Sequence, residues 1–296
     1  MPRVPLAASV ETISLLQLVP LGVLVALYAA RARSLAKDGA PLARWRQICF
    51  YSGSASIAVA LGALARVGQE LLFPHTLGDL VFGDVAAALI VLGLTEPLLA
   101  PLNRFGAVDR LRVLSHPLPA FTLWVLDLYA WHLPALYQAA LDHALLQALQ
   151  HAMLLLCAIN MWMCLLGPFP GPRWFGNGAK LLYIIAVRVA GVVLSNVILW
   201  SGTVLYPHYL TGEARFHVSP LADQGIAGAI LLFEQALVAL CLFYWLHSRV
   251  AGEGQLVKPS RARGLGDAPS ARAPAGPGEP ERHDRLQART GAPERM

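Results

Sequence analysis

Charged residues are scarce in this chain. Asp, Glu, Lys and Arg make up 14% of its 296 residues, whereas about a quarter is usual for a soluble domain. Hydrophobic residues make up 56%, and the mean hydropathy is +0.53. This composition excludes an ordinary soluble domain and indicates a membrane protein.

Lysine and cysteine are also rare, and each shortage excludes a class of protein. The only lysines are Lys37, Lys180 and Lys258, so no lysine lies in the last apolar stretch to form the Schiff base of a retinal protein. The four cysteines lie in or beside apolar stretches without paired extracellular spacing, which favours apolar packing over disulfides. They are Cys49, Cys157, Cys164 and Cys241.

Motifs for tight Cu(I) binding are missing too, because the chain has neither a Met-rich segment nor a cysteine pair. Serine, cysteine and histidine are not grouped for nucleophilic chemistry, and no glycine-rich phosphate loop opens a helix. We therefore expect a protein that is not an enzyme.

Seven stretches are apolar enough to cross a membrane, although the fourth is short. They are residues 13–30, 48–66, 76–102, 117–132, 145–166, 181–203 and 223–246. Lipid leaves no water for unpaired backbone groups, and the stretches lack the alternation of barrel strands, so helices are expected. The predicted fold class is all-α, a polytopic membrane helical bundle with seven transmembrane helices.

The predicted domains are a seven-helix transmembrane domain at residues 1–248 and a disordered cytoplasmic tail at residues 249–296. The tail is rich in Pro, Gly, Ala and Arg and has few large apolar residues with which to offset the entropy of ordering. The first apolar stretch could instead be a cleaved signal peptide. Its length and the following Arg31 and Arg33 favour a retained span.

Basic residues predict the orientation of the chain. Nineteen of 23 lie in the alternate connections 31–47, 103–115 and 168–180 or after residue 248. Lys and Arg near span ends remain in the cytoplasm, which predicts a multi-pass protein with the N-terminus outside and the C-terminus in the cytoplasm. The lipid bilayer is then the expected partner of these basic residues. The sequence has no basic face with interleaved aromatic residues, so a nucleic-acid partner is not expected.

Six of the nine histidines fall on the predicted outer face or just inside it. They are His75, His132, His143, His151, His208 and His217. A cluster of imidazoles above an apolar bundle is what a metal or haem site needs. The alternative is a set of ordinary interfacial histidines that bond to loops.

Spacing selects some of these histidines as candidate metal ligands. His75 and Asp79 are four residues apart and share one helix face. His151 follows Gln147 by the same spacing. His132 lies between Trp131 and Pro134 in a segment where the aromatic residues are interpreted as anchors at the membrane interface.

Charged residues inside the spans form a second candidate network. Asp127, Arg188 and Glu234 lie within apolar stretches, where ionisable groups face the bundle interior. Pairing of Arg188 with Asp127 or Glu234 would lock the helices together, and a proton or ion path is the alternative. In the last span, Asp223 is expected near the N-terminus of its own helix, where the helix dipole favours a carboxylate.

The motifs together resemble one family. Ser115-His116-Pro117, the segment Trp131-His132-Leu133-Pro134-Ala135-Leu136-Tyr137, His151 with Trp162, and Asp223-Gln224 with Gly228 occur in this order. They are similar to the CtaG family of seven-span cytochrome c oxidase assembly proteins, the Bacillus-type group and not the single-span copper chaperone that shares its name. The resemblance covers roughly residues 75 to 234.

The resemblance implies a membrane assembly factor for haem-copper cytochrome c oxidase in the bacterial cytoplasmic (inner) membrane. It would assist copper delivery or insertion from the outer face, with oxidase subunits as partners. The implied copper ligands are His75, Asp79, His132 and His151. The chain departs from the family pattern, which often has histidine at position 79 and a histidine and a glutamate where this chain has Gln147 and Gln150. Amides bind copper less well than imidazole, so a weak, transient site is expected.

Two other functions remain open at this stage. A haem-binding membrane cytochrome would use two axial histidines, for which His132 and His151 are candidates, and a Soret band would reveal it. A transporter for copper or another small solute would use the charges inside the spans, although no internal repeat or broken helix is evident.

Overall fold

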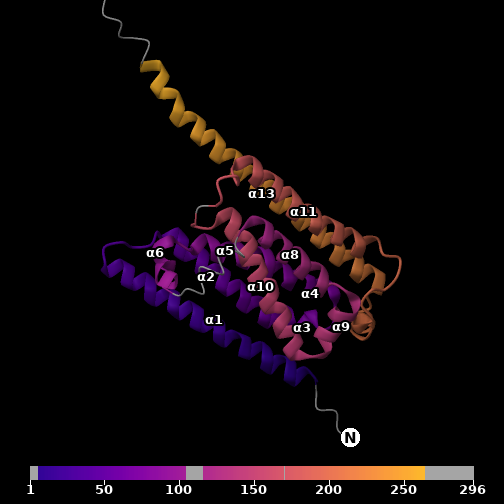
Figure 1. Cartoon of the computed structure of the whole chain (residues 1–296). Helices are drawn as coiled ribbons and strands as arrows, with labels where there is room; N and C mark the ends of the chain where they lie inside the picture. Colours follow the sequence, from indigo (N-terminus) through magenta and orange to yellow (C-terminus); the bar gives the residue numbers. More distant parts are fainter. Residues whose placement is uncertain (1–5, 105–115, 170, 264–296) are drawn as a thin grey trace, which may run out of the picture. The chain divides into compact units, whose positions relative to one another are not determined.

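The structure is a computed structural model that describes residues 6–104, 116–169 and 171–263. These residues form helices and their connections, with no strand among them (Figure 1). The elements are α1 Leu6–Lys37, α2 Arg44–Val59, η1 Ala60–Leu64, α3 Ala65–Gly68, α4 Leu72–Leu80, η2 Val81–Ala86, α5 Ala87–Gly93, α6 Glu96–Leu99, η3 Ala100–Arg104, α8 Pro117–Trp131, α9 Pro134–Asp142, α10 Ala144–Leu166, α11 Asn177–Trp200, η4 Pro207–Tyr209, α12 Leu210–Phe216 and α13 Pro220–Arg263.

Six described helices are long and apolar enough to cross a membrane, which confirms the predicted helical membrane bundle. They are Leu16–Lys37, Arg44–Gly68, Leu72–Gly93, Ala144–Leu166, Asn177–Trp200 and Pro220–Ala251. The predicted count of seven is not met, because α8, the predicted fourth span, has only 15 residues. Pro117 begins α8 and Pro134 begins the next helix. Its length of about 22 Å is less than the thickness of the hydrocarbon core.

Two other predicted boundaries also move. The predicted span 76–102 is Leu72–Gly93 in the structure, and the chain turns extended at Leu94 and Thr95 before α6. α13 continues to Arg263, past the predicted domain boundary at residue 248. By internal contacts the chain divides between Val250 and Ala251. The rest of the predicted tail, 264–296, lies outside the described residues.

Two clusters of buried apolar side chains hold the helices of residues 16–250 together. The larger joins α5, α8, α10, α11 and α13, and its fully buried members include Ala158, Met161 and Ile184. The second joins α1, α2 and α5 and contains Phe50, stacked on Tyr28. Many large apolar side chains outside these clusters are exposed, as lipid-facing residues of a membrane bundle are.

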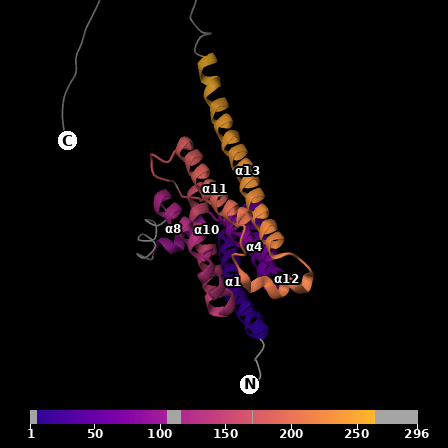
Figure 2. The ribbon, with the colours of Figure 1, turned by 90° about the vertical axis from the view of Figure 1, so that its right-hand side faces the viewer.

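Three of the predicted outer connections meet at one end of the bundle, which we call the histidine end. The Arg215 guanidinium contacts the Glu70 carboxylate at 2.7 Å, which joins α12, between α11 and α13, to the connection before α4. The Tyr206 hydroxyl donates to the backbone carbonyl of His132 at 2.9 Å. α12 lies at the end where α13 begins (Figure 2).

The connections rich in basic residues meet at another end, which we call the basic end. The Arg31 side chain donates to the Pro97 carbonyl at 3.0 Å. Arg46 donates to the carbonyls of Leu92 and Leu94 at 3.0 and 2.9 Å, and so satisfies the C-terminus of α5. The predicted segregation of histidines from basic connections therefore fits these contacts. Which end faces the cytoplasm stays a prediction.

Asp223 lies in the first turn of α13, as expected, and its side chain also caps a second helix, α4. Its carboxylate, fully buried, accepts hydrogen bonds from the backbone N–H groups of Leu72 and Phe73, at 2.7 and 3.0 Å. These groups open α4, so a residue of the last span satisfies the N-terminus of the third. This bond fixes the depth of α4, which carries His75, relative to α13.

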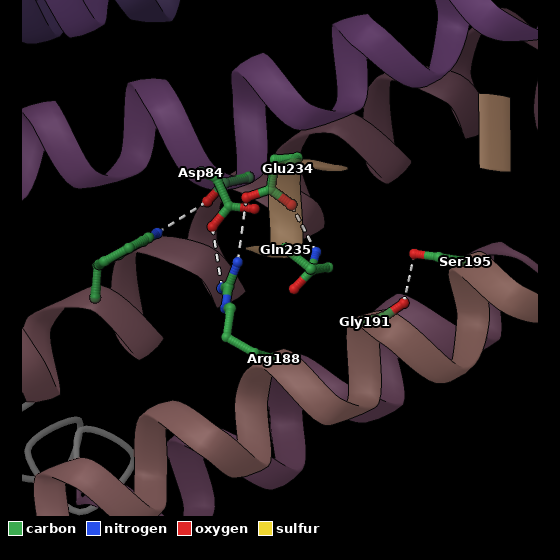
Figure 3. A network of polar contacts seen from close by, with 8 residues as sticks. Asp84, Arg188, Gly191, Ser195, Glu234 and Gln235 are labelled. Atoms are coloured by element: carbon green, nitrogen blue, oxygen red, sulfur yellow. Dashed lines mark hydrogen bonds and ion pairs between the residues drawn. The ribbon is translucent and has the colours of Figure 1, made fainter. Parts of the chain in front are cut away.

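Arg188 ties three helices together inside the bundle (Figure 3). Its guanidinium contacts the carboxylates of Asp84, in η2, and Glu234, in α13, at 3.2 Å each. The predicted Arg188–Glu234 pair is confirmed. The alternative partner Asp127 instead accepts from the indole N–H of Trp131 at 3.0 Å. Asp84 lay inside a predicted span and could have been included among the candidate partners.

Gly228 allows α13 to pack closely against α11. A Cβ at Gly228 would lie 2.6 Å from the backbone nitrogen of Leu199, whereas a Cβ at Gly225 would meet nothing within 4 Å. We expect Gly228→Ala to lower the free energy of unfolding by about 1–3 kcal/mol, because backbone cannot move aside as a side chain can. Gly225→Ala, the matched control, should leave stability unchanged or slightly raised. Denaturant unfolding in detergent measures both, and equal stability of the two variants would contradict the packing.

Glu213 makes stability at the histidine end depend on pH. It lies in α12 between two spans, is buried, and its Oε2 has no hydrogen-bond partner. Burial and then the nearby Asp223 carboxylate raise the pKa of Glu213 from 4.5 to about 7. As pH rises through this window, the unfolded chain loses the proton before the folded chain does, so stability falls.

We therefore expect Glu213→Gln to reduce the loss of stability between about pH 4.5 and about pH 7. The measurement is the unfolding midpoint of the purified protein at a series of pH values. Glu96→Gln, which removes an exposed carboxylate at another connection, should keep the wild-type pH dependence. An unaltered pH profile in Glu213→Gln would contradict the assignment.

Candidate metal site at the histidine end

His75 presents an unsatisfied ring nitrogen inside the protein. The side chain lies in the first turns of α4 and is 7% exposed. Its Nδ1 lies 3.3 Å from the backbone carbonyl of Gly68, so we assign the ring proton to Nδ1. Nε2 is buried without a hydrogen-bond partner. It therefore presents a lone pair, the form in which imidazole binds a metal.

Asp79 faces this nitrogen from the next turn of the same helix. Its Oδ2 lies 3.7 Å from Nε2 of His75, as the predicted four-residue spacing requires. An imidazole lone pair and a carboxylate are both acceptors, so a cation fits between them. The sequence prediction that His75 and Asp79 share one face is confirmed.

His132 lies close to this pair but belongs to a different helix. It ends α8, and its Nδ1 lies 2.7 Å from the carbonyl of Leu128, which leaves Nε2 as the nitrogen with a lone pair. Burial lowers the pKa of His132, while the nearby Asp79 carboxylate opposes that shift. The ring is therefore neutral near pH 7 and competent as a ligand.

A cluster of tyrosines packs against the two histidines. The Tyr137 ring centroid is 5.3 Å from that of His75 and 6.0 Å from that of His132. The Tyr137 and Tyr209 hydroxyls are 3.1 Å apart, and the Tyr206 ring packs on Tyr137 at 4.2 Å. Burial raises the pKa of Tyr137 and Tyr209 well above its usual value, so both stay protonated and uncharged.

His151 reaches the same region from α10. It lines a small cavity together with His75, Asp79 and Gln147. Its ring stacks on Phe82 at 4.8 Å, and its Nδ1 lies 3.1 Å from Oε1 of Gln17 in α1. The cavity, about 20 Å³, has room for about one water molecule or one ion.

Three of the four predicted ligands line the cavity and one does not. His75, Asp79 and His151 line it, whereas His132 lies outside the lining and its ring packs near the Tyr137 ring, as that of His75 does. Among the residues whose side chains are described, no group of three or more His, Cys, Asp or Glu is close enough to hold a metal ion. The arrangement is therefore a pair of facing acceptors with two further imidazoles nearby.

The remaining outer histidines have other surroundings. His143 is exposed at the start of α10. His208 lies 3.6 Å from the Asp142 carboxylate near the surface. His217 ends α12 in the left-handed backbone conformation, at φ 57°, and its side chain is exposed. None of these three lines the cavity with His75.

The interpretation of Trp131 and Tyr137 as interface anchors is wrong. Both are buried, at 6% and 2% exposure, and both bond to other side chains inside the protein. Sequence reasoning also missed Tyr206 and Tyr209, which pack on the site from the connection after α11. Their three-residue spacing beside Pro207 is the only local signal, and it does not reveal their partners.

Comparison with known proteins identifies the family. No curated protein and no solved structure matches the chain. Residues 26–253 match the sequence model of the family described as cytochrome c oxidase caa3 assembly factor (Caa3_CtaG). The match includes His75, Asp79, His132 and the tyrosine cluster. It extends over more than half of the chain and agrees with the resemblance found in the motifs, and the chain therefore belongs to the cytochrome c oxidase caa3 assembly factor family.

Proposed function

We propose that this assembly factor holds copper transiently at the histidine end and passes it to a cytochrome c oxidase subunit outside the bacterial cytoplasmic membrane. Copper is the cargo in this proposal, and no bound copper is required for the fold. The observation that carries the proposal is the buried Nε2 of His75, without a partner and facing the Asp79 carboxylate. Family membership supports the oxidase as the destination.

The donor set suits transfer better than storage. Imidazole is a good copper ligand, whereas a carboxylate is harder, and the amide of Gln147 binds copper poorly. Two facing donors with His132 and His151 nearby leave the coordination of an ion incomplete. A ligand from the protein that gives or receives the copper can complete the coordination. Loss of that ligand then lowers the barrier to release of the copper.

The tyrosine cluster has a supporting role in this proposal. Tyr137 packs near both His75 and His132, and its hydroxyl is held by that of Tyr209. The cluster thus positions the ligands without binding the metal.

Copper binding is tested on the purified full-length protein. We expect His75→Ala and His132→Ala each to lower copper affinity at least about tenfold, because each removes one of few ligands. His143→Ala removes an exposed imidazole at the same end and should bind copper as wild type does. Copper bound after equilibration with a competing chelator is the measurement. Equal binding by all three variants would contradict the proposed ligands.

Copper loading of the oxidase tests the function in the cell. We expect deletion of this protein to lower the copper content and activity of cytochrome c oxidase in isolated membranes, and His143→Ala to restore both. His132→Ala should restore neither, although it reaches the membrane in equal amount. Unchanged oxidase in the deletion strain would contradict an assembly role, and full rescue by His132→Ala would contradict only the copper step.

A further inference from the structure

A second cavity lies at the basic end, and no histidine is among its lining residues. Its volume is about 500 Å³. Segments from α2, α5, α10, α11 and α13, with the connection after α10, line it. The lining residues used below are Trp45, Arg46, Lys180, Trp245 and Arg249.

Three cationic side chains line this cavity, and no acidic residue does. Arg46 comes from α2, Lys180 from α11 and Arg249 from α13. The side-chain donors of Arg46 reach the carbonyls of Leu92 and Leu94, which are neutral and leave its charge in place. The lining therefore brings together three cationic side chains from three different helices.

Two tryptophans place the cavity at the edge of the apolar spans. Arg46 lies over the Trp45 ring at 4.5 Å, and Arg249 lies over the Trp245 ring at 5.0 Å. Trp45 belongs to the first turn of a span and Trp245 to the last turns of another. Tryptophan beside basic residues at span ends is typical of the level of lipid headgroups.

An apolar surface continues from the cavity along α2. Ile48 follows Trp45 by three residues and is 64% exposed, so the two share a helix face. A ligand with an anionic head and a hydrocarbon tail fits a basic cavity that opens onto such a face. Free phosphate has no hydrocarbon tail and would leave the apolar face of α2 uncovered.

We propose that the cavity at the basic end binds the phosphate headgroup of an anionic phospholipid, with its acyl chains along the exposed face of α2. Arg46, Lys180 and Arg249 bind the phosphate, and Trp45 and Trp245 pack beside the glycerol region. Basic pockets between spans at this level bind such headgroups in other membrane proteins. The proposal is independent of copper transfer at the histidine end.

The test is a titration of the full-length protein in neutral detergent with phosphatidylglycerol, with bound lipid counted by native mass spectrometry. We expect Lys180→Gln/Arg249→Gln to weaken binding about 25-fold, because each basic side chain contributes about fivefold in affinity for an anionic surface. Arg33→Gln/Lys37→Gln, which removes two exposed charges at the basic end outside the cavity, should bind as wild type does. Arg46 is left intact because it also satisfies α5.

Two further measurements make the result decisive. Lys180→Arg/Arg249→Lys conserves the charge and should keep binding close to wild type, so its failure would overturn the proposed charge recognition. Inorganic phosphate should not displace the lipid at equal concentration, and displacement would assign the cavity to free phosphate instead. Equal loss in the cavity variant and the Arg33/Lys37 variant, or retention of phosphatidylglycerol by Lys180→Gln/Arg249→Gln, would also overturn the proposal.

Discussion

Lipid supplies no hydrogen bonds, and the arrangement of this bundle follows from that constraint. A polar group inside a span must therefore find its partner within the protein, and a charged group usually finds it on another helix. Arg188 does so with Asp84 and Glu234, and Asp223 does so with the N–H groups that open α4. These contacts join the third span to the last and to α11, and they set the depth at which α4 presents its histidine.

The same constraint bears on His75. Its Nε2 is one of several buried polar atoms without a hydrogen-bond partner among the described residues, and it faces the Asp79 carboxylate. An unpaired buried acceptor costs free energy, and this one is held by Gly68 on one side and by Tyr137 on the other. The unsatisfied acceptor pair lowers stability, but it gives a protein that must bind and release a cation a place for that cation.

Sequence reasoning predicted what depends on composition and local spacing. The helical membrane bundle, the shared face of His75 and Asp79, and the Arg188–Glu234 pair are confirmed. It did not predict contacts between distant segments. Asp223 is about 150 residues from the N–H groups that it caps. Burial of Tyr137 depends on the connection that carries Tyr209. The bounds of α8 were predicted to within one residue, but the helix is too short to count as a span.

The ligands of bound copper test the central claim most directly. X-ray absorption spectroscopy of the copper-loaded full-length protein distinguishes nitrogen and oxygen donors from sulfur. The account predicts imidazole nitrogen and carboxylate oxygen, with the imidazole signal reduced in His75→Ala. Sulfur ligation, from thiols such as Cys157 or Cys164, or a spectrum that His75→Ala leaves unchanged would contradict it.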